Sequence, residues 1–480
     1  MPRYDLLIVG GGPAGLAALA EVSAVGLRAA LVDERVTLGG QIYKQPGPGF
    51  EIRDHAGLGR DHVAGRRLID AAVATGAPIM SATSVVAIRG GVVVLVPEGE
   101  RATTVEADNV LLAPGAYDRP VAFPGWTLPG VLTAGGMQTL AKTQRVLPGE
   151  RTVFAGSGPL ALAFPAQLQA LGADVAAVLE AGPPPRPVDL ARMLRAARGN
   201  TDLLRDAARY RARLLRARVP LRYRRIVVRA EGEGRVEAVV HAAADRDWRP
   251  VPDTEERIVA DTLCLGYGFA PSTELLRLAG CAFGHDPERG GHVVTVDGWM
   301  RTSVPRVFAA GDGTGVEGAY VAQDEGRLAA LGAALDSGRI TAQAARTAAA
   351  PIRRRLRRRR ALRAALRRMH AFGAGIDELA DAATVVCRCE EVTLGQLDEA
   401  VATTADVSVV KGLTRAGMGL CQGRNCQHHV AALIARRHGV PIADVPVATP
   451  RSPVRPVPLG AIADAEQEDE RFFTAPGRAR

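Results

Sequence analysis

The sequence predicts an α/β protein with two Rossmann-like dinucleotide-binding domains and a small, mainly helical C-terminal domain that holds a metal centre. Three observations support this fold class. A glycine-rich turn that begins at Gly10 separates a strand from a helix, and the same arrangement recurs 146 residues later at Gly156. Four of the six cysteines lie between Cys387 and Cys426. At roughly 150 residues per domain, 480 residues are enough for about three domains.

Composition and charge exclude several classes of function. Hydrophobic residues make up 47% and charged residues 23%, as in ordinary globular proteins. Aromatic residues make up only 4%, which argues against stacking platforms for single-stranded nucleic acid. The net charge of +9 comes from ten arginines within residues 353–368. We therefore expect no nucleic-acid partner.

The N-terminus leads directly into a strand, with no small-residue cleavage site of a signal peptide. Residues 152–173 carry no charge, but glycines and prolines interrupt them, so we expect no membrane span. The protein is therefore predicted to be cytoplasmic. Attachment to the inner face of the membrane through partner proteins is the alternative.

The first nucleotide-binding unit opens with the apolar run Tyr4-Asp-Leu-Leu-Ile-Val9, which is typical of a buried parallel strand. Glycines then follow in the G-x-G-x-x-G pattern, and a second strand over 28–32 ends in an acid. The first glycine allows the tight turn, the second lets a pyrophosphate approach, and the third lets helix and strand pack closely. The acid accepts from a ribose hydroxyl. The expected binding residues are Gly10, Gly12, Pro13, Ala14, Gly15, Asp33 and Glu34.

The second unit repeats this order after a strand that begins at Thr152. Its expected binding residues are Gly156, Gly158, Ala161 and Glu180. Glu180 favours a free ribose 2′-hydroxyl, and hence NAD over NADP. However, Ala161 replaces the third glycine and an unusual insertion follows. Another adenine nucleotide, or an empty site, therefore remains an alternative to NAD(H).

Further segments resemble the two-dinucleotide-binding-domain flavoproteins, which include the pyridine nucleotide–disulfide reductases. The resemblance covers about residues 1–340 and implies FAD in the first site. It adds Gly40, Gln41, Ala113, Gly115, Gly311 and Asp312 to the expected FAD contacts. No cysteine precedes Cys264, so the redox-active cysteine pair of the disulfide reductases is missing, and we do not expect disulfide reduction.

The motifs divide the chain into six segments. Residues 182–220 form an insertion with two predicted helical stretches, which serves as a solvated hairpin or as a partner-docking arm. The predicted segments are 1–120 (FAD-binding, first part), 121–265 (NAD(P)-type), 266–338 (FAD-binding, second part), 339–383 (arginine-rich helical connector), 384–450 (metal-binding domain) and 451–480 (C-terminal tail).

The C-terminal cysteines form two local pairs. Cys387 and Cys389 make a C-x-C pair, and Cys421 and Cys426 are separated by four residues. Zinc sites usually use C-x-x-C pairs, whereas this spacing suits a [2Fe–2S] cluster in which each iron takes two thiolates. A zinc site and a site without metal remain alternatives at this point.

The residues around the cysteines resemble the [2Fe–2S] domain related to bacterioferritin-associated ferredoxin, over about 384–440. The stretches that carry the resemblance are Val386-Cys-Arg-Cys-Glu-Glu-Val-Thr393 and Lys411-Gly-Leu-Thr-Arg-Ala-Gly-Met-Gly-Leu-Cys-Gln-Gly-Arg-Asn-Cys426. Lys411, Arg415 and Arg424 would offset the negative charge of the cluster, with ordinary surface charge as the alternative. Because four thiolates complete the ligand set, we do not expect His428 and His429 to be ligands.

The order of parts over about 1–460 resembles the α-type subunits of bacterial amine and imino-acid dehydrogenases. This family includes opine oxidase, hydrogen cyanide synthase and the proline and hydroxyproline dehydrogenases. The resemblance implies a partner subunit that carries FAD, is similar to glycine or D-amino-acid oxidases, and oxidises the substrate. The α-type subunit takes the electrons through FAD and [2Fe–2S]. Some complexes add an FMN at a subunit interface and a small ferredoxin-like subunit.

No acid–base or nucleophile constellation is evident in the sequence, so no catalytic residue is assigned. This agrees with an electron-transfer subunit of a heteromeric opine, proline, hydroxyproline or glycine dehydrogenase or oxidase. One alternative is a stand-alone NAD(P)H-dependent reductase that passes electrons to its own cluster. Another is a structural or regulatory subunit with a non-redox metal site.

Overall fold

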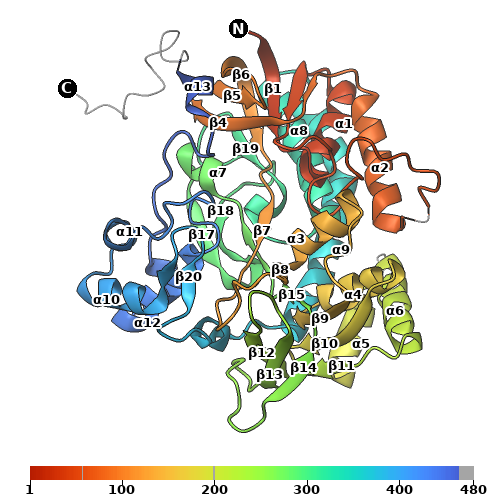
Figure 1. Cartoon of the computed structure of the whole chain (residues 1–480). Helices are drawn as coiled ribbons and strands as arrows, with labels where there is room; N and C mark the ends of the chain where they lie inside the picture. The colour runs from red at the N-terminus through yellow and green to blue at the C-terminus, as the bar shows by residue number, and fades with distance from the viewer. Residues whose placement is uncertain (57, 198–200, 464–480) are drawn as a thin grey trace. The chain divides into compact units, whose positions relative to one another are not determined.

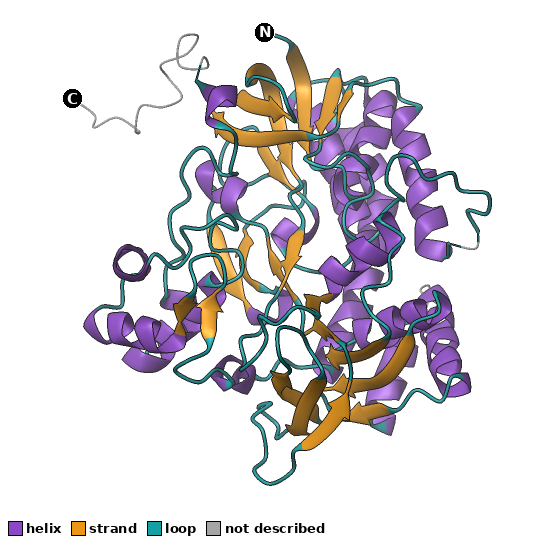
Figure 2. Cartoon of the chain, in the orientation of Figure 1, coloured by secondary structure: helices purple, strands orange, loops and turns teal. Residues whose placement is uncertain are grey.

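Two β-sheets, one in each of two units of the chain, form the centre of the fold (Figure 1). The computed structural model describes residues 1–56, 58–197 and 201–463. The first unit comprises Met1–Ala116, Pro271–Arg357 and the chain from Thr449, and the second comprises Tyr117–Ala270 and Arg358–Ala448. Helices and strands alternate through most of the chain, which confirms the predicted α/β class (Figure 2).

The sheet of the first unit has the strand order β3-β2-β1-β6-β5-β4, and β19 also pairs with β6. Strands β1, β2, β3, β6 and β19 are parallel, whereas β4, β5 and β6 pair in antiparallel fashion. The strands are β1 (Arg3–Val9), β2 (Ala29–Val32), β3 (Ile79–Met80), β4 (Thr83–Arg89), β5 (Val92–Pro97), β6 (Thr103–Leu112) and β19 (Val307–Ala309). The parallel part is the predicted Rossmann-like sheet.

Apolar side chains of β1 pack on both faces of this sheet, because successive residues of a strand point to opposite faces. Leu6 and Ile8 join a core with α1 (Pro13–Val25) and α8 (Ala319–Asp336). Leu7 and Val9 join a second core on the other face. Burying a leucine or isoleucine side chain contributes about 1.5–3 kcal/mol, so these two cores hold the strand that carries the first glycine turn.

The second unit contains an all-parallel sheet with the strand order β11-β10-β9-β15-β8. A three-stranded antiparallel sheet of β12, β13 and β14 lies in the same unit. The elements are β8 (Val131–Thr133), α3 (Ala134–Gln138), β9 (Arg151–Gly156), α4 (Leu160–Ala170), β10 (Asp174–Glu180), β11 (Leu221–Tyr223), β12 (Arg225–Glu231), β13 (Ala238–Ala243), β14 (Glu256–Val259) and β15 (Thr262–Gly266).

The predicted insertion contains two helices, α5 (Pro187–Ala196) and α6 (Thr201–Arg216), where the sequence predicts two helical stretches. Residues 198–200 of the insertion, and residues 464–480 of the predicted tail, lie outside the described part. Strands β7 (Ala116–Asp118) and β16 (Phe269–Pro271) lie where the chain passes from one unit to the other. The first unit also contains α2 (Arg60–Val73), α7 (Glu274–Leu278), β17 (Phe283–Asp286), β18 (Gly291–Val294) and α13 (Leu459–Ile462).

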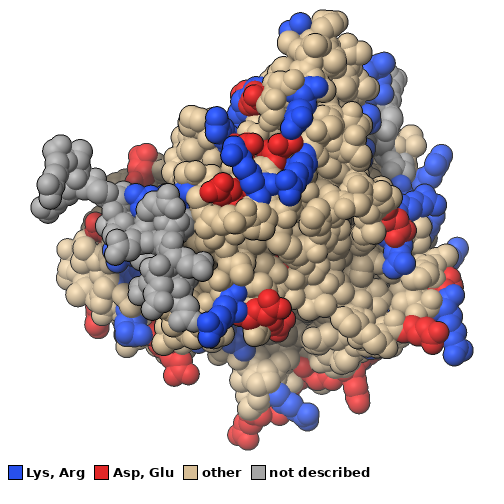
Figure 3. Space-filling view, turned by 90° about the horizontal axis from the view of Figure 1, so that it is seen from above, with Lys and Arg blue, Asp and Glu red and all other residues tan. Residues whose placement is uncertain are grey.

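The arginine-rich segment forms the helix α9 (Ala342–Met369), which begins in the first unit and ends in the second. Ile352, Leu356 and Leu362 of this helix are buried. Within the described residues, no helix has the length and apolarity that a membrane span requires. On the face shown in Figure 3, basic and acidic side chains are interspersed.

The C-terminal domain consists of a short hairpin and three helices, and it shares a hydrophobic core with the parallel sheet of the second unit. Its elements are β20 (Val385–Cys387), β21 (Val392–Thr393), α10 (Leu394–Thr403), α11 (Val407–Thr414) and α12 (Gln427–His438). The indole Nε1 of Trp126 donates to the carbonyl of Val385 at 2.6 Å. The hairpin that carries the first cysteine pair is therefore fixed to the segment before β8.

Candidate functional site: two nucleotide-binding turns and a cysteine cluster

The first glycine turn has the geometry of a pyrophosphate-binding turn. Gly10 follows β1 with φ of +110°, and a Cβ atom there would overlap the carbonyl of Ala113. A Cβ atom on Gly15 would overlap the carbonyl of Gly10. Helix α1 begins at Pro13, and no side chain caps its N-terminus. The first-turn amides and the positive end of the helix dipole can therefore face an anionic ligand.

The acid at the end of β2 is tied to this turn. The amide of Gly11 donates to Oδ2 of Asp33 at 2.5 Å, and the amide of Arg35 donates to Oδ1 at 2.7 Å. Burial of Asp33 raises the pKa of its carboxyl, although these two amides act in the opposite direction. The next acid, Glu34, is more exposed and forms an ion pair with Arg455 at 2.9 Å. The two acids predicted at the ribose end therefore have different partners.

The other predicted FAD contacts lie mostly around the same turn. The amide of Gly39 donates to the carbonyl of Gly11 at 2.9 Å, and a Cβ atom on Gly40 would lie 2.8 Å from the Cα atom of Gly12. A Cβ atom on Gly311 would lie 3.1 Å from the Cβ atom of Ala14. The side-chain oxygen of Gln41 accepts from Lys44 at 2.6 Å. Gly115 has φ of +74°. Asp312 belongs to the short 3-10 helix Gly311–Thr314, which follows β19.

Sequence reasoning missed one buried acid of this site, Glu325 on α8. Its Oε2 accepts from the amide of Gly311 at 2.8 Å and from the hydroxyl of Thr314 at 3.0 Å. Glu325 is 1% exposed. Two adjacent acids, Asp324 and Glu325, in a mostly apolar helix were the available signal, because buried carboxylates need hydrogen-bond donors. Glu325 holds the turn that carries Gly311 and Asp312.

The second glycine turn is also formed, but a histidine lies against it. Gly158 has φ of +88°, and its amide donates to Oε2 of Glu180 at 3.0 Å. The imidazole Nδ1 of His370 lies 3.8 Å from the same oxygen. A Cβ atom on Gly158 would lie 4.0 Å from the ring of His370. The imidazole therefore borders the side of the turn at which the motif binds a pyrophosphate.

The departure from the glycine pattern at Ala161 is accommodated. Ala161 is 1% exposed, and its amide donates to the carbonyl of Gly158 at 3.0 Å. A Cβ atom on Gly156 would overlap the carbonyl of Gly266, so this glycine allows β9 and β15 to approach closely. The predicted residues Gly156, Gly158, Ala161 and Glu180 lie together at one end of the second sheet.

The four predicted metal ligands converge in two pairs of side chains. Cys387 hydrogen-bonds Cys426, and Cys389 hydrogen-bonds Cys421. Each pair therefore combines one cysteine from the hairpin with one from the loop before α12. This exchange brings two distant chain segments together through two pairs of thiols, the arrangement in which each of two irons could take two thiolates.

Local electrostatics favour a thiolate at Cys387. The hydrogen bond from Cys426 lowers the pKa of Cys387 to about 5, and the amides of Gly417, Glu390 and Cys389 act in the same direction. The same hydrogen bond, together with burial, raises the pKa of Cys426. Burial also raises the pKa of Cys389. Backbone amides directed at sulfur are one means by which proteins tune iron–sulfur clusters.

Glycines give the cysteine loop its close approach to the hairpin. A Cβ atom on Gly419 would overlap that of Cys389, and one on Gly417 would lie 4.0 Å from the Sγ atom of Cys426. Gly417 and Gly423 have φ of +86° and +83°. A side chain at Gly419 would push the loop away from the hairpin, whereas Gly417 and Gly423 supply the left-handed backbone conformation of the loop.

The basic residues predicted near the cluster have specific partners. Arg424 donates to the hydroxyl of Tyr117 at 2.6 Å and to the carbonyl of Cys421 at 3.0 Å. Arg415 pairs with Glu390 at 2.7 Å. Lys411 lies in the last turn of α11. Arg424 thus fixes the cysteine loop, a structural contribution that the sequence did not reveal.

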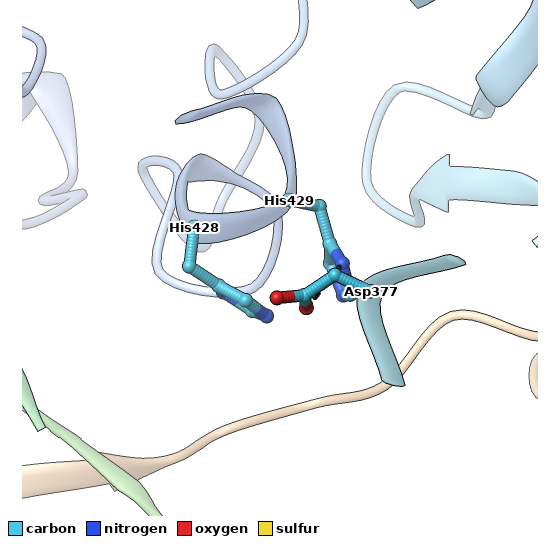
Figure 4. Close-up of side chains that lie close together, drawn as sticks. All are labelled: Asp377, His428 and His429. Carbon is cyan, nitrogen blue, oxygen red and sulfur yellow. Dashed lines mark ion pairs between the residues drawn. The ribbon is translucent and has the colours of Figure 1, made fainter. Parts of the chain in front are cut away.

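Two histidines of α12 form a cluster with Asp377, in which His429 is buried and the other two residues are partly buried (Figure 4). The Nε2 atom of His428 lies 2.9 Å from the carbonyl of Pro120, and Nδ1 of His429 lies 3.6 Å from Oδ1 of Asp377. Arg119 donates to the other oxygen of Asp377 at 2.8 Å. Burial lowers the pKa of both histidines, that of His429 to about 4, so both are neutral near pH 7. This cluster attaches α12 to the segment that contains Arg119 and Pro120.

Comparison with known proteins adds the following matches. The family model for pyridine nucleotide-disulphide oxidoreductases matches residues 4–326, and that for the sarcosine oxidase A3 domain matches residues 382–466. Hydrogen cyanide synthase subunit HcnB of Pseudomonas aeruginosa is 36% identical over 469 residues, which cover 96% of this chain and 99% of that protein. An opine oxidase subunit of Rhizobium meliloti is 33% identical over 493 residues, covering 99% of this chain and 90% of that protein.

Among solved structures, L-proline dehydrogenase from P. horikoshii has a similar fold. The TM-score is 0.68 at 22% sequence identity, and the match covers 96% of this chain and 79% of that chain. At this identity the likeness concerns the fold. It extends beyond the two nucleotide-binding domains into the C-terminal part of the chain.

Proposed function

From the premise that this chain belongs to the pyridine nucleotide-disulphide oxidoreductase family and is a flavin-dependent oxidoreductase, we propose that it is the electron-transfer subunit of a heteromeric amino- or imino-acid dehydrogenase or oxidase. The substrate class is an opine, proline or hydroxyproline, or glycine. Relatives that align over nearly the whole chain are named as subunits of oxidases and synthases, which supports a partner subunit.

The observation that carries the proposal is the convergence of four cysteines. Cys387 pairs with Cys426 and Cys389 with Cys421, and amides are directed at the sulfur of Cys387. These donors fit a [2Fe–2S] cluster, in which two thiolates bind each iron. Such a cluster accepts and releases one electron at a time when it is bound.

The first glycine turn supplies a fitting site for FAD. Gly10 and Gly15 allow its tight backbone, because a Cβ atom at either position would overlap a backbone carbonyl, and no side chain caps the N-terminus of α1. Asp33 and Glu34 stand at the end of β2, where the motif places the acceptor of the ribose hydroxyl. A bound flavin exchanges one or two electrons, so it can connect a two-electron oxidation to a one-electron cluster.

We assign substrate oxidation to the partner, a FAD-dependent subunit similar to glycine or D-amino-acid oxidases. The amine or imino acid would lose two electrons there, and the electrons would then pass to this chain. An FMN at the subunit interface and a small ferredoxin-like subunit are further parts of the proposed complex. We place the complex in the cytoplasm, with peripheral attachment to the inner membrane face as the alternative.

An anaerobic NADH titration of the purified chain tests how electrons enter. We expect the flavin and cluster absorption bands to persist, because His370 borders the second glycine turn where NADH would bind. Adding the partner subunit and its amino-acid substrate should bleach the same bands. Dithionite, which reduces both cofactors chemically, is the positive control.

Rapid bleaching by NADH alone would contradict the proposal. It would instead favour a stand-alone NAD(P)H-dependent reductase, for which the intact turn of Gly156 and Gly158 and the buried Glu180 are the supporting observations. The second site would then hold NAD(H). Another adenine nucleotide in that site, with no reduction by NADH, is compatible with the proposal.

Metal analysis of the full chain tests the cysteine centre. We expect two iron atoms and two labile sulfides per chain, because two thiolates are available for each iron of a [2Fe–2S] cluster. Zinc without sulfide would favour a structural or regulatory subunit with a non-redox site. Iron quantification, sulfide release and electron paramagnetic resonance after reduction provide three independent measurements.

A further inference from the structure

The segment that follows the C-terminal domain returns to the first unit and lies on its antiparallel strands. The amide of Val454 donates to the carbonyl of Val86 at 3.0 Å, and the amide of Ala102 donates to the carbonyl of Ala461 at 2.7 Å. Ala461 packs with Val86 and Val94 in a small core. Figure 1 shows α13 beside β4 and β5. These contacts fix the segment 451–462 against β4, β5 and the loop that follows β5.

This placement brings Arg455 to Glu34. Its Nη2 atom lies 2.9 Å from Oε2 of Glu34, and 24% of the arginine side chain is exposed. Glu34 directly follows Asp33, whose two carboxylate oxygens already accept from the amides of Gly11 and Arg35. Of these two acids, Glu34 is therefore the one whose side chain is bound by a residue from outside the glycine turn.

The ion pair contributes little to folding, because Glu34 is 46% exposed and surface ion pairs are weak. Its location is what matters, since the end of β2 is where this motif binds the ribose. A guanidinium has five donors, so Arg455 can hold Glu34 and still face a ligand that carries hydroxyl and phosphate oxygens.

We propose that residues 451–462 form an outer wall of the FAD site, in which Arg455 positions Glu34 and determines FAD affinity. This inference rests on the proposed flavin in the first site, but on neither the cluster nor the partner. Because linkage is reciprocal, bound FAD must also hold the segment more firmly in place.

The first test compares FAD affinity of the full-length apoprotein by fluorescence titration. We expect Arg455→Ala to weaken FAD binding about tenfold, a typical coupling between two interacting sites. Arg455→Lys keeps the charge but not the planar fork, and should have an intermediate effect. In a Glu34→Gln background, Arg455→Ala should have little further effect. Arg339→Ala is the matched control, because Arg339 forms a surface ion pair with Asp5 at 3.0 Å in the same unit.

The second test is hydrogen exchange of the segment with and without FAD. FAD should slow exchange of the amide of Val454 in the wild-type chain, and much less in Arg455→Ala. Equal FAD affinity of Arg455→Ala and wild type, within twofold, would overturn the inference alone. Failure of the wild-type chain to bind FAD would overturn both the inference and the proposed flavoprotein function. The two failures are therefore distinguishable.

Discussion

Replacing Cys389 with serine is expected to yield a folded flavoprotein without an iron–sulfur cluster. Cys389 is the exposed member of the four cysteines, so the substitution leaves the core of the domain intact. A serine hydroxyl is a poor replacement for a soft thiolate ligand, and one iron would keep only one thiolate. Iron and sulfide should fall from two of each per chain to nearly none, and electron flow from the partner's substrate should stop. Iron analysis and visible absorption measure this outcome.

Cys281→Ala is the matched control for this experiment. Cys281 lies in the first unit and is not part of the converging set, so its removal should leave the cluster unchanged. FAD content should be the same in both variants, because the glycine turn belongs to the first unit. A Cys389→Ser chain that keeps two irons and two sulfides would exclude the four-cysteine ligand set.

Replacing Gly15 with alanine is expected to remove most of the bound flavin. The added methyl group would overlap the carbonyl of Gly10, so either the turn or the start of α1 has to move. Overpacking of this kind costs about 1–3 kcal/mol. If this strain displaces the turn that binds FAD, the affinity for FAD falls by about tenfold to a hundredfold. Fluorescence titration of the apoprotein gives the dissociation constant.

Gly284→Ala controls for the loss of a glycine in the same unit. A Cβ atom on Gly284 meets no other atom within 4 Å, so this variant should bind FAD normally. The thermal midpoint of both variants must be measured, because strain at Gly15 also lowers stability. A Gly15→Ala chain with unchanged FAD affinity would remove the first glycine turn from the flavin site.

Sequence patterns predicted the local parts of this molecule well. The strand before Gly10 and the strand before Gly156 were predictable because buried parallel strands are continuous apolar runs, and a turn without a Cβ atom needs glycine at fixed spacing. Two local pairs of thiols are a metal-binding pattern, which made the approach of the four cysteines predictable, while their role as metal ligands stays a prediction. Each of these signals lies within a short stretch of chain.

Contacts between distant segments left no such signal. Glu34 meets Arg455 across 421 positions, and His370 meets Glu180 across 190 positions. Which arginine or histidine reaches a given carboxylate depends on how the sheets and connections fold back, and many candidates carry the same charge. The pairing of Asp377 with His429 was unpredictable for the same reason.

The domain that carries the four cysteines has its own hairpin and helices, but its hydrophobic core continues into the parallel sheet of the second unit. Trp126 bonds Val385, and Arg119 bonds Asp377, across this shared core. Such a domain cannot swing on a tether as a mobile electron shuttle, because detaching it would expose apolar surface to water. If the cysteine centre transfers electrons as proposed, a redox partner must dock at a fixed surface of this domain.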